Sequence, residues 1–284
     1  MPRPREPILK TLIIQSYRTR DVAAWITTCL ESVRAWAAAR GHDYEFVDDA
    51  LFDLAPAWVR ERCGTQILPV TDVARLYLMR ERLRLGWQRV VWVDADVLIF
   101  APERFVLDNR MPYALCREVW LSWHGDRIET AEFVNNAVIV MTQSQPILDF
   151  WLFAAEEILR THPPGPVEKL IVGTRLLTDL AKAMPLRVIS NVGLFSPPVI
   201  RDIAHGGGPS VQAWSQRHGH VVDAANLCAS LQDREAGGTR IGAAELEQAV
   251  QALLRSNGAI VNDHLMPSED RLQFVEGSVS GASG

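Results

Sequence analysis

The run from Arg89 to Phe100, RVVWVDADVLIF, constrains the fold of this chain more than any other stretch. Its first half is apolar and rich in valine, which predicts a buried strand. Two carboxylates one residue apart, Asp94 and Asp96, follow at the carboxyl end of that strand. In open α/β sheets, ligands bind beyond the carboxyl ends of the strands. The sequence therefore predicts an α/β protein with a site at Asp94 and Asp96.

Asp94 and Asp96 repel each other unless a positive partner lies nearby. Oxygen ligands of this kind suit Mg²⁺ or Mn²⁺, and these ions also bind the phosphates of substrates. The pattern predicts a divalent cation that carries a phosphorylated substrate. An Asp-rich turn after a strand is the alternative interpretation.

The segments around this strand predict a βαβ beginning. Residues 9–15 and 43–48 have strand patterns, and residues 21–40 have the periodicity of an amphipathic helix. A second helix is expected to begin at Thr71, which can serve as its N-cap, and to end at Gly86.

Further elements are predicted along the rest of the chain. These are helices at 56–62, 146–160, 167–183 and 243–255, strands at 111–117, 136–141, 186–189 and 258–261, and a Trp-rich turn at 120–125. Residues 197–240 contain several Pro and Gly clusters, which favour a loop-rich lid or acceptor loop, and residues 276–284 have the composition of a disordered tail.

Composition excludes some classes of function. Among 284 residues the formal net charge is −5, so the chain lacks the basic face of a nucleic-acid binder. Residues 1–7 lack the apolar region of a signal peptide, and no apolar run has the length of a membrane span. The four cysteines have no C-x-x-C spacing and predict reduced thiols. We expect a cytoplasmic protein. Peripheral contact with a membrane is compatible with this expectation.

Four segments resemble one known family. They are the first strand at 11–15, the Thr71-Asp72-x-x-Arg75 segment, the Trp92-x-Asp94-x-Asp96 segment, and the pair Asn135-Asn136. Together they resemble the retaining, metal-dependent nucleotide-sugar glycosyltransferases of the GT-A fold. The similarity is to the DXD sugar-binding group, which includes initiating α-mannosyltransferases, clostridial toxin glucosyltransferases and bacterial polysaccharide transferases. It covers about residues 9–195, with Thr71 where the family has Ser and no Pro in the looser match at 172–178.

The resemblance implies a fold. We expect a single GT-A-type domain over residues 1–275, in which a mixed central sheet is flanked by helices. Residues 8–100 would form a Rossmann-like nucleotide-binding half, and residues 101–275 would form the half that holds the sugar and the acceptor.

The resemblance also implies roles for individual residues. Asp94, Asp96 and Asn136 would be catalytic, and Asp94, Asp96 and His264 would bind Mn²⁺ or Mg²⁺, with Asp263 as the alternative third ligand. The residues implied in donor binding are Ile14, Gln15, Ser16, Asp72, Arg75, Trp92, Asp94 and Asn135. Each of these residues also has a purely structural interpretation. These are a surface ion pair for Asp72 and Arg75, a core position for Trp92, and a turn for the two asparagines.

The implied activity is transfer of a sugar from a nucleotide-diphosphate donor, with UDP-sugars favoured, to a hydroxyl of a glycan or small-molecule acceptor. Retention at the anomeric carbon is implied by the family alone. One rival is a phosphatase of the haloacid dehalogenase type, in which Asp94 would be the nucleophile and Asp96 the acid/base. Another rival is a non-catalytic sugar-binding protein on the same fold.

Overall fold

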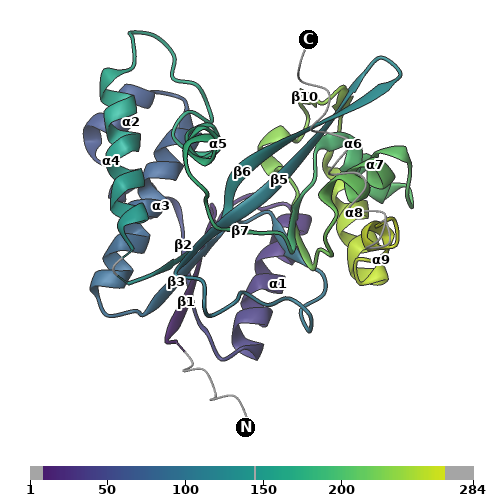
Figure 1. Cartoon of the computed structure of the whole chain (residues 1–284), viewed down its shortest axis with the longest axis horizontal. Helices are drawn as coiled ribbons and strands as arrows, with labels where there is room; N and C mark the ends of the chain where they lie inside the picture. Colours follow the sequence, from purple (N-terminus) through teal and green to yellow (C-terminus); the bar gives the residue numbers. More distant parts are fainter. Residues whose placement is uncertain (1–8, 144, 266–284) are drawn as a thin grey trace.

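A six-stranded mixed sheet forms the centre of the computed structural model, which describes residues 9–143 and 145–265 (Figure 1). The predicted tail at 276–284 lies outside these residues. The strand order is β2-β1-β3-β6-β5-β7, in which β1, β2 and β3 are parallel and β6 runs antiparallel to β3 and β5. The strands are β1 (Thr11–Ser16), β2 (Asp43–Val47), β3 (Arg89–Val93), β5 (Tyr113–His124), β6 (Arg127–Thr142) and β7 (Val188–Ile189).

Alternating side chains of β1 and β3 bury the two faces of this sheet against different helices. Trp92 and Ile14 point into a core with one group of helices, whereas Ile13 and Val91 point toward α1 (Ala24–Ala39). The helices of the first group are η1 (Asp49–Leu54), α2 (Ala57–Cys63), α3 (Ile67–Arg84), α4 (Pro146–Thr161) and α5 (Thr174–Ala183). The predicted mixed α/β sheet flanked by helices is confirmed, as is the βαβ beginning.

The β5–β6 hairpin reaches beyond the carboxyl end of β3 (Figure 1). Val93 pairs with Val138, so all of β6 before Val138 extends past β3. The prediction of a Trp-rich turn at 120–125 was wrong, because these residues continue β5 to His124. The turn lies one step later, where Gly125 adopts a φ of 66° that suits glycine.

A bulge interrupts the β5–β6 pairing near the centre of the molecule. Ala114 pairs with Val140, but Cys116 pairs with Asn135, so two steps along β5 match five along β6. Extra residues of this kind bend a strand and re-aim its side chains. The bulge therefore decides where Asn135 and Asn136 point.

A second layer packs beside α1 and against β5, and its helices and strands overturn the prediction of a loop-rich segment at 197–240. Its core joins α1 to a small sheet of order β4-β9-β8 and to the last four helices. The misleading signal was proline, since Pro197 and Pro209 each begin a helix, where proline is favoured. The elements are β4 (Val97–Ile99), β8 (Val192–Leu194), α6 (Pro197–Ala204), α7 (Pro209–His218), β9 (Ala224–Asn226), η2 (Ala229–Leu231), β10 (Glu235–Ala236), β11 (Thr239–Arg240), α8 (Ala243–Ser256) and α9 (Ala259–Asn262).

Three further boundaries differ from the predictions. The helix α3 begins at Ile67, so Thr71 is not its N-cap, and its hydroxyl donates to the Ile67 carbonyl instead. The helix predicted at 167–183 begins only at Thr174. Residues 259–262 form a helix and not the predicted strand: Asn257, at a φ of 50°, ends α8, and Gly258, at a φ of 79°, is the N-cap of α9.

Candidate functional site at the carboxyl edge of the sheet

The site lies where β1, β2 and β3 end together. Parallel register brings Ser16 beside Val47 and Ile14 beside Trp92, so the chain after β3 leaves the sheet at the same edge. The amide of Gln15 donates to the Asp94 carbonyl at 3.2 Å. These contacts hold Asp94 at the sheet edge, as the sequence predicts.

Arg75 of α3 is the centre of a buried hydrogen-bond network at this edge. Its guanidinium lies 2.8 Å from Asp72 Oδ1, 3.0 Å from Asp94 Oδ1 and 3.0 Å from the Asn136 carbonyl oxygen. The same group lies over the Trp92 ring at 5.2 Å. Arg75 is 5% exposed, so the surface ion pair considered for Asp72 and Arg75 does not describe this contact.

Asp94 and Asp72 are fixed by further donors. The Trp92 indole donates to Asp94 Oδ1 at 2.7 Å, and the Asn136 amide donates to Asp72 Oδ1 at 2.8 Å. Trp92 therefore has both a core position and a polar contact to the site. Asn136 lies inside β6 and not in a turn, so the turn interpretation of this residue was wrong.

Gly173, the N-cap of α5, packs closely against Asp72 and Asn136 of this network. A Cβ atom at this position would lie 2.5 Å from Asp72 Oδ2 and 3.1 Å from the Asn136 amide nitrogen. A side chain at this position is therefore excluded by direct contact with the network.

Asp96 binds a different part of the molecule from Asp94. Its Oδ1 accepts from the Asn226 amide at 2.7 Å, and its Oδ2 accepts from the Ala229 backbone N–H at 2.7 Å. Both partners belong to the second layer, more than a hundred residues along the chain. The two carboxylates of the D-x-D segment thus join the central sheet to that layer.

Burial and mutual repulsion perturb these acids. Burial raises the pKa of Asp72 and of Asp94, while the positive charge of Arg75 opposes the shift in both. Burial, together with the charge of Asp94, raises the pKa of Asp96 to about 6. The Asp94 side chain keeps 26% of its surface exposed, so it can be reached from solvent. A cation beside the pair would relieve this repulsion.

Asn135, beside the bulge, contacts β5 and α5, whereas Asn136 contacts α3. Its amide nitrogen lies 2.9 Å from Glu118 Oε2 and 3.4 Å from the Thr174 hydroxyl of α5. Its own oxygen accepts from the Ala137 N–H at 2.6 Å. Asn135 therefore joins a second buried carboxyl group, on β5, to the start of α5.

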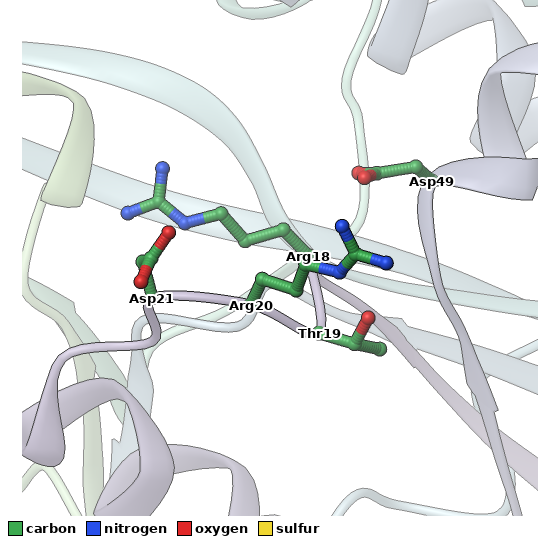
Figure 2. Close-up of a pocket in the computed structure, with 5 residues that line it drawn as sticks. All are labelled: Arg18, Thr19, Arg20, Asp21 and Asp49. Atoms are coloured by element: carbon green, nitrogen blue, oxygen red, sulfur yellow. The ribbon is translucent and has the colours of Figure 1, made fainter.

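A cavity of about 390 Å³ opens at the ends of β1 and β2 (Figure 2). Its lining comes from the segment between β1 and α1 and from the first residue of η1, and consists of Arg18, Thr19, Arg20, Asp21 and Asp49. Figure 2 shows two guanidinium groups and two carboxylates around this space. Its size falls in the range of sites for small ligands, and its arginines suit an anionic group.

Other predicted residues lie outside the Arg75 network. Ile14 is fully buried in the core, so only its backbone could reach a ligand. Ser16 donates its hydroxyl to the Asp48 carbonyl at 3.5 Å. His264 follows α9 and not a strand, and residues 9–143 and 145–265 contain no group of three metal-ligating side chains. The predicted set of Asp94, Asp96 and His264, or Asp263, is therefore not assembled.

Sequence reasoning missed the contacts that depend on distant segments. Asn226 and Ala229 lie in the segment predicted as a loop, and Glu118 lies in a strand with no local motif.

Comparison with known proteins yields distant similarities. No protein-family profile matches the chain, and no curated protein sequence matches it. A crystal structure of a glycosyltransferase involved in the glycosylation of the major capsid of PBCV-1 is 12% identical, with a TM-score of 0.44, over 85% of this chain and 98% of that one. The inositol-1-phosphate CTP transferase from T. maritima is 11% identical, with a TM-score of 0.31, over 64% of this chain and 86% of that one. At this level neither structure assigns a function. Within the described residues, no helix has the length and apolar character to cross a membrane.

Proposed function

We propose that the protein is a glycosyltransferase that moves a sugar from a nucleotide-diphosphate donor, with UDP-sugars favoured, to a hydroxyl of a glycan or small-molecule acceptor. The observation that carries this proposal is the Arg75 network. Asp72, Asp94 and Asn136 come from three separate segments, and all contact Arg75 or each other at the carboxyl edge of the sheet. The family resemblance implies donor binding for Asp72, Arg75 and Asp94, and a catalytic role for Asn136.

Mn²⁺ or Mg²⁺ fits this site as an ion held jointly by protein and substrate. Mg²⁺ is commonly bound by one or two carboxylates together with substrate phosphates, and the structure offers Asp94 and Asp96 for this role. Their raised pKa values reflect burial and, at Asp96, repulsion by Asp94, which a cation would relieve. When bound, the ion would stabilise negative charge on the departing diphosphate.

The residues of the chain supply the other parts of the reaction. Arg75 fixes Asp94, so that carboxylate keeps one orientation. Arg18 and Arg20 stand at the cavity beside β1 and can offer positive charge to phosphate oxygens. As the bond between the sugar and the diphosphate breaks, its electron pair goes to the diphosphate oxygen. Such preorganised charge lowers the barrier to bond breaking. Retention at the anomeric carbon stays a prediction, which NMR of the first product tests.

A thermal-shift panel of UDP-, GDP- and CDP-sugars, each with and without Mn²⁺, tests the donor. We expect the melting temperature to rise with a UDP-sugar and Mn²⁺ together, because a ligand that binds only the folded state stabilises it. In Asp96→Asn this shift and the turnover should be lost while the circular dichroism spectrum is kept.

The matched control is Asp149→Asn, since that carboxylate is 70% exposed on α4 and should leave the shift unchanged. Absence of any shift in the whole panel would contradict the proposal and support a non-catalytic protein. Hydrolysis of a simple phosphate ester without a nucleotide would instead support the phosphatase alternative.

A further inference from the structure

Glu118 is a buried carboxyl group that the proposed donor site does not use. It lies in the middle of β5 and is 6% exposed. Its Oε2 accepts from the Asn135 amide at 2.9 Å, and its Oε1 has no hydrogen-bond partner in the described part of the chain. Burial raises the pKa of Glu118 to about 7, and the bond from Asn135 only partly opposes this. A carboxyl group that titrates near neutrality suits proton transfer.

A continuous line of contacts joins Glu118 to the donor network. Glu118 contacts Asn135, which in turn contacts Thr174 at the start of α5. The residue before Thr174, Gly173, packs closely against Asp72. Burial is the main cause that raises the pKa of the Cys228 thiol, and the charges of Asp96, Glu118 and Asp94 add to it. Cys228 therefore lies within electrostatic reach of all three carboxyl groups.

The strand face that carries Glu118 also carries aromatic side chains. Residues two apart on a strand share a face, so Trp120 lies on the same face as Glu118. Phe133 pairs directly with Glu118 across the hairpin. Trp120 and Phe133 are both half-buried, and β6 before Val138 extends past the end of β3. Small-ligand sites are lined mainly by aromatic and other apolar side chains with a few polar groups, and this strand face has that composition.

We propose that Glu118 receives the proton of the acceptor hydroxyl, and that the acceptor is a carbohydrate whose ring lies against Trp120 and Phe133. This inference deepens the proposed function and rests on it. In the step, the acceptor oxygen bonds to the anomeric carbon as its proton passes to Glu118. The bond from that carbon to the diphosphate breaks, and the diphosphate keeps the electron pair.

Glu118→Gln tests the role, because glutamine can still accept the bond from Asn135 but cannot take a proton. The assay follows release of the nucleoside diphosphate from UDP-glucose with Mn²⁺, with water alone and with a panel of mono- and disaccharides as acceptors. We expect kcat to fall by roughly 100- to 10,000-fold with an unchanged KM for the donor. Formate, a small external base, should restore part of the rate.

The pH profile distinguishes proton transfer from a structural role. The wild-type rate should fall as the pH drops through about 7, the pKa of Glu118, and this limb should be absent from Glu118→Gln. The titratable groups that face Glu118 are the Cys116 and Cys228 thiols, whose pKa values burial raises, and beyond them Asp94 and Asp96. Both proteins share these groups, so the difference reports Glu118.

Glu129→Gln is the matched control, since Glu129 lies on the same hairpin and its side chain is 59% exposed. It should keep the wild-type rate and pH profile. Wild-type kcat and pH profile in Glu118→Gln would overturn the inference, and so would a loss of donor affinity in that variant.

Saccharide binding gives a readout that does not depend on the donor. Saturation-transfer NMR should detect binding of one or more members of the saccharide panel to the wild-type protein and its loss in Trp120→Ala. If no saccharide binds, the acceptor face is wrong. If saccharides bind but no nucleotide sugar does, the proposed transferase function fails while the carbohydrate site at Trp120 and Phe133 stands.

Discussion

At the scale of single residues, Arg75 has the largest effect on the candidate site. It is a buried cation between two acids, and its removal would leave Asp72 and Asp94 without their positive partner. We expect Arg75→Met to lower the free energy of unfolding by about 3–5 kcal/mol, because unpaired buried charges are costly. Urea unfolding followed by tryptophan fluorescence measures this change.

Arg80→Met on the same helix is the control. Arg80 lies 3.6 Å from Asp149 in a pair whose acid is 70% exposed, so its loss should cost about 1 kcal/mol or less. Equal losses in both variants would show that Arg75 is no more than another charged residue of α3.

Short-range spacing explains why these residues could be predicted. Asp72 and Arg75 lie three apart on one helix, and Asp94 follows a strand made of apolar residues, so their placement is visible in the local sequence. The partners of Asp96 could not be predicted in this way. Asn226 and Ala229 reach Asp96 only because the second layer folds back onto the sheet edge.

At the scale of elements, the start of α5 sets the spacing between two helices at the site. Gly173 is the N-cap of α5, and an added methyl group would meet the Asp72 carboxylate of α3. We expect Gly173→Ala to destabilise the protein by about 1–3 kcal/mol through overpacking and to weaken donor binding. Unfolding in urea and the thermal-shift panel measure the two effects.

Gly242→Ala separates this contact from the ordinary cost of alanine at a helix start. Gly242 is the N-cap of α8 and has a φ of −107°, close to that of Gly173, but its nearest contact to an added Cβ is at 3.5 Å. The cost of a changed N-cap is common to both variants. If Gly242→Ala destabilises the protein as much as Gly173→Ala, the contact with Asp72 has no effect.

Most long elements could be predicted from the spacing of their hydrophobic residues, and most errors came from the interpretation of proline, glycine and tryptophan. The pattern of α1, α4 and α8 repeats every three to four residues, which is a strong helix signal. Pro197 and Pro198 favoured the prediction of a loop, although they begin α6. The tryptophans near the end of β5 were interpreted as a turn. Their strand conformation depends on pairing with β6, which the local sequence does not reveal.

At the scale of the whole molecule, two buried groups should shape stability against pH in opposite directions. Burial lowers the pKa of His218 to about 4 from 6.5, with Arg117 and His220 adding to the shift. Between these values only the unfolded chain binds the proton, so stability falls as the pH drops from 6.5 to 4. Glu118 has a pKa of about 7 against 4.5, so the folded state keeps a proton and stability falls as the pH rises from 4.5 to 7.

We expect His218→Phe and Glu118→Gln to change the pH dependence of the unfolding free energy in opposite directions. Relative to the wild type, His218→Phe should gain stability at the acid end, and Glu118→Gln should gain it at the neutral end. Each difference should amount to about 3 kcal/mol at most, since one pKa unit corresponds to about 1.4 kcal/mol. Urea unfolding across pH 4.5 to 7 measures the curves. Parallel curves for the three proteins would contradict both assignments.

The bulge between β5 and β6 has a consequence for how this protein can change. A smooth ladder would pair every residue of the hairpin and would turn Asn135 and Asn136 to opposite sides of the sheet, as neighbours on a regular strand must be. Shortening β6 by the surplus residues would therefore keep the sheet but change the positions of Asn135 and Asn136. Engineering that regularises this hairpin would therefore displace side chains that we propose for the donor site.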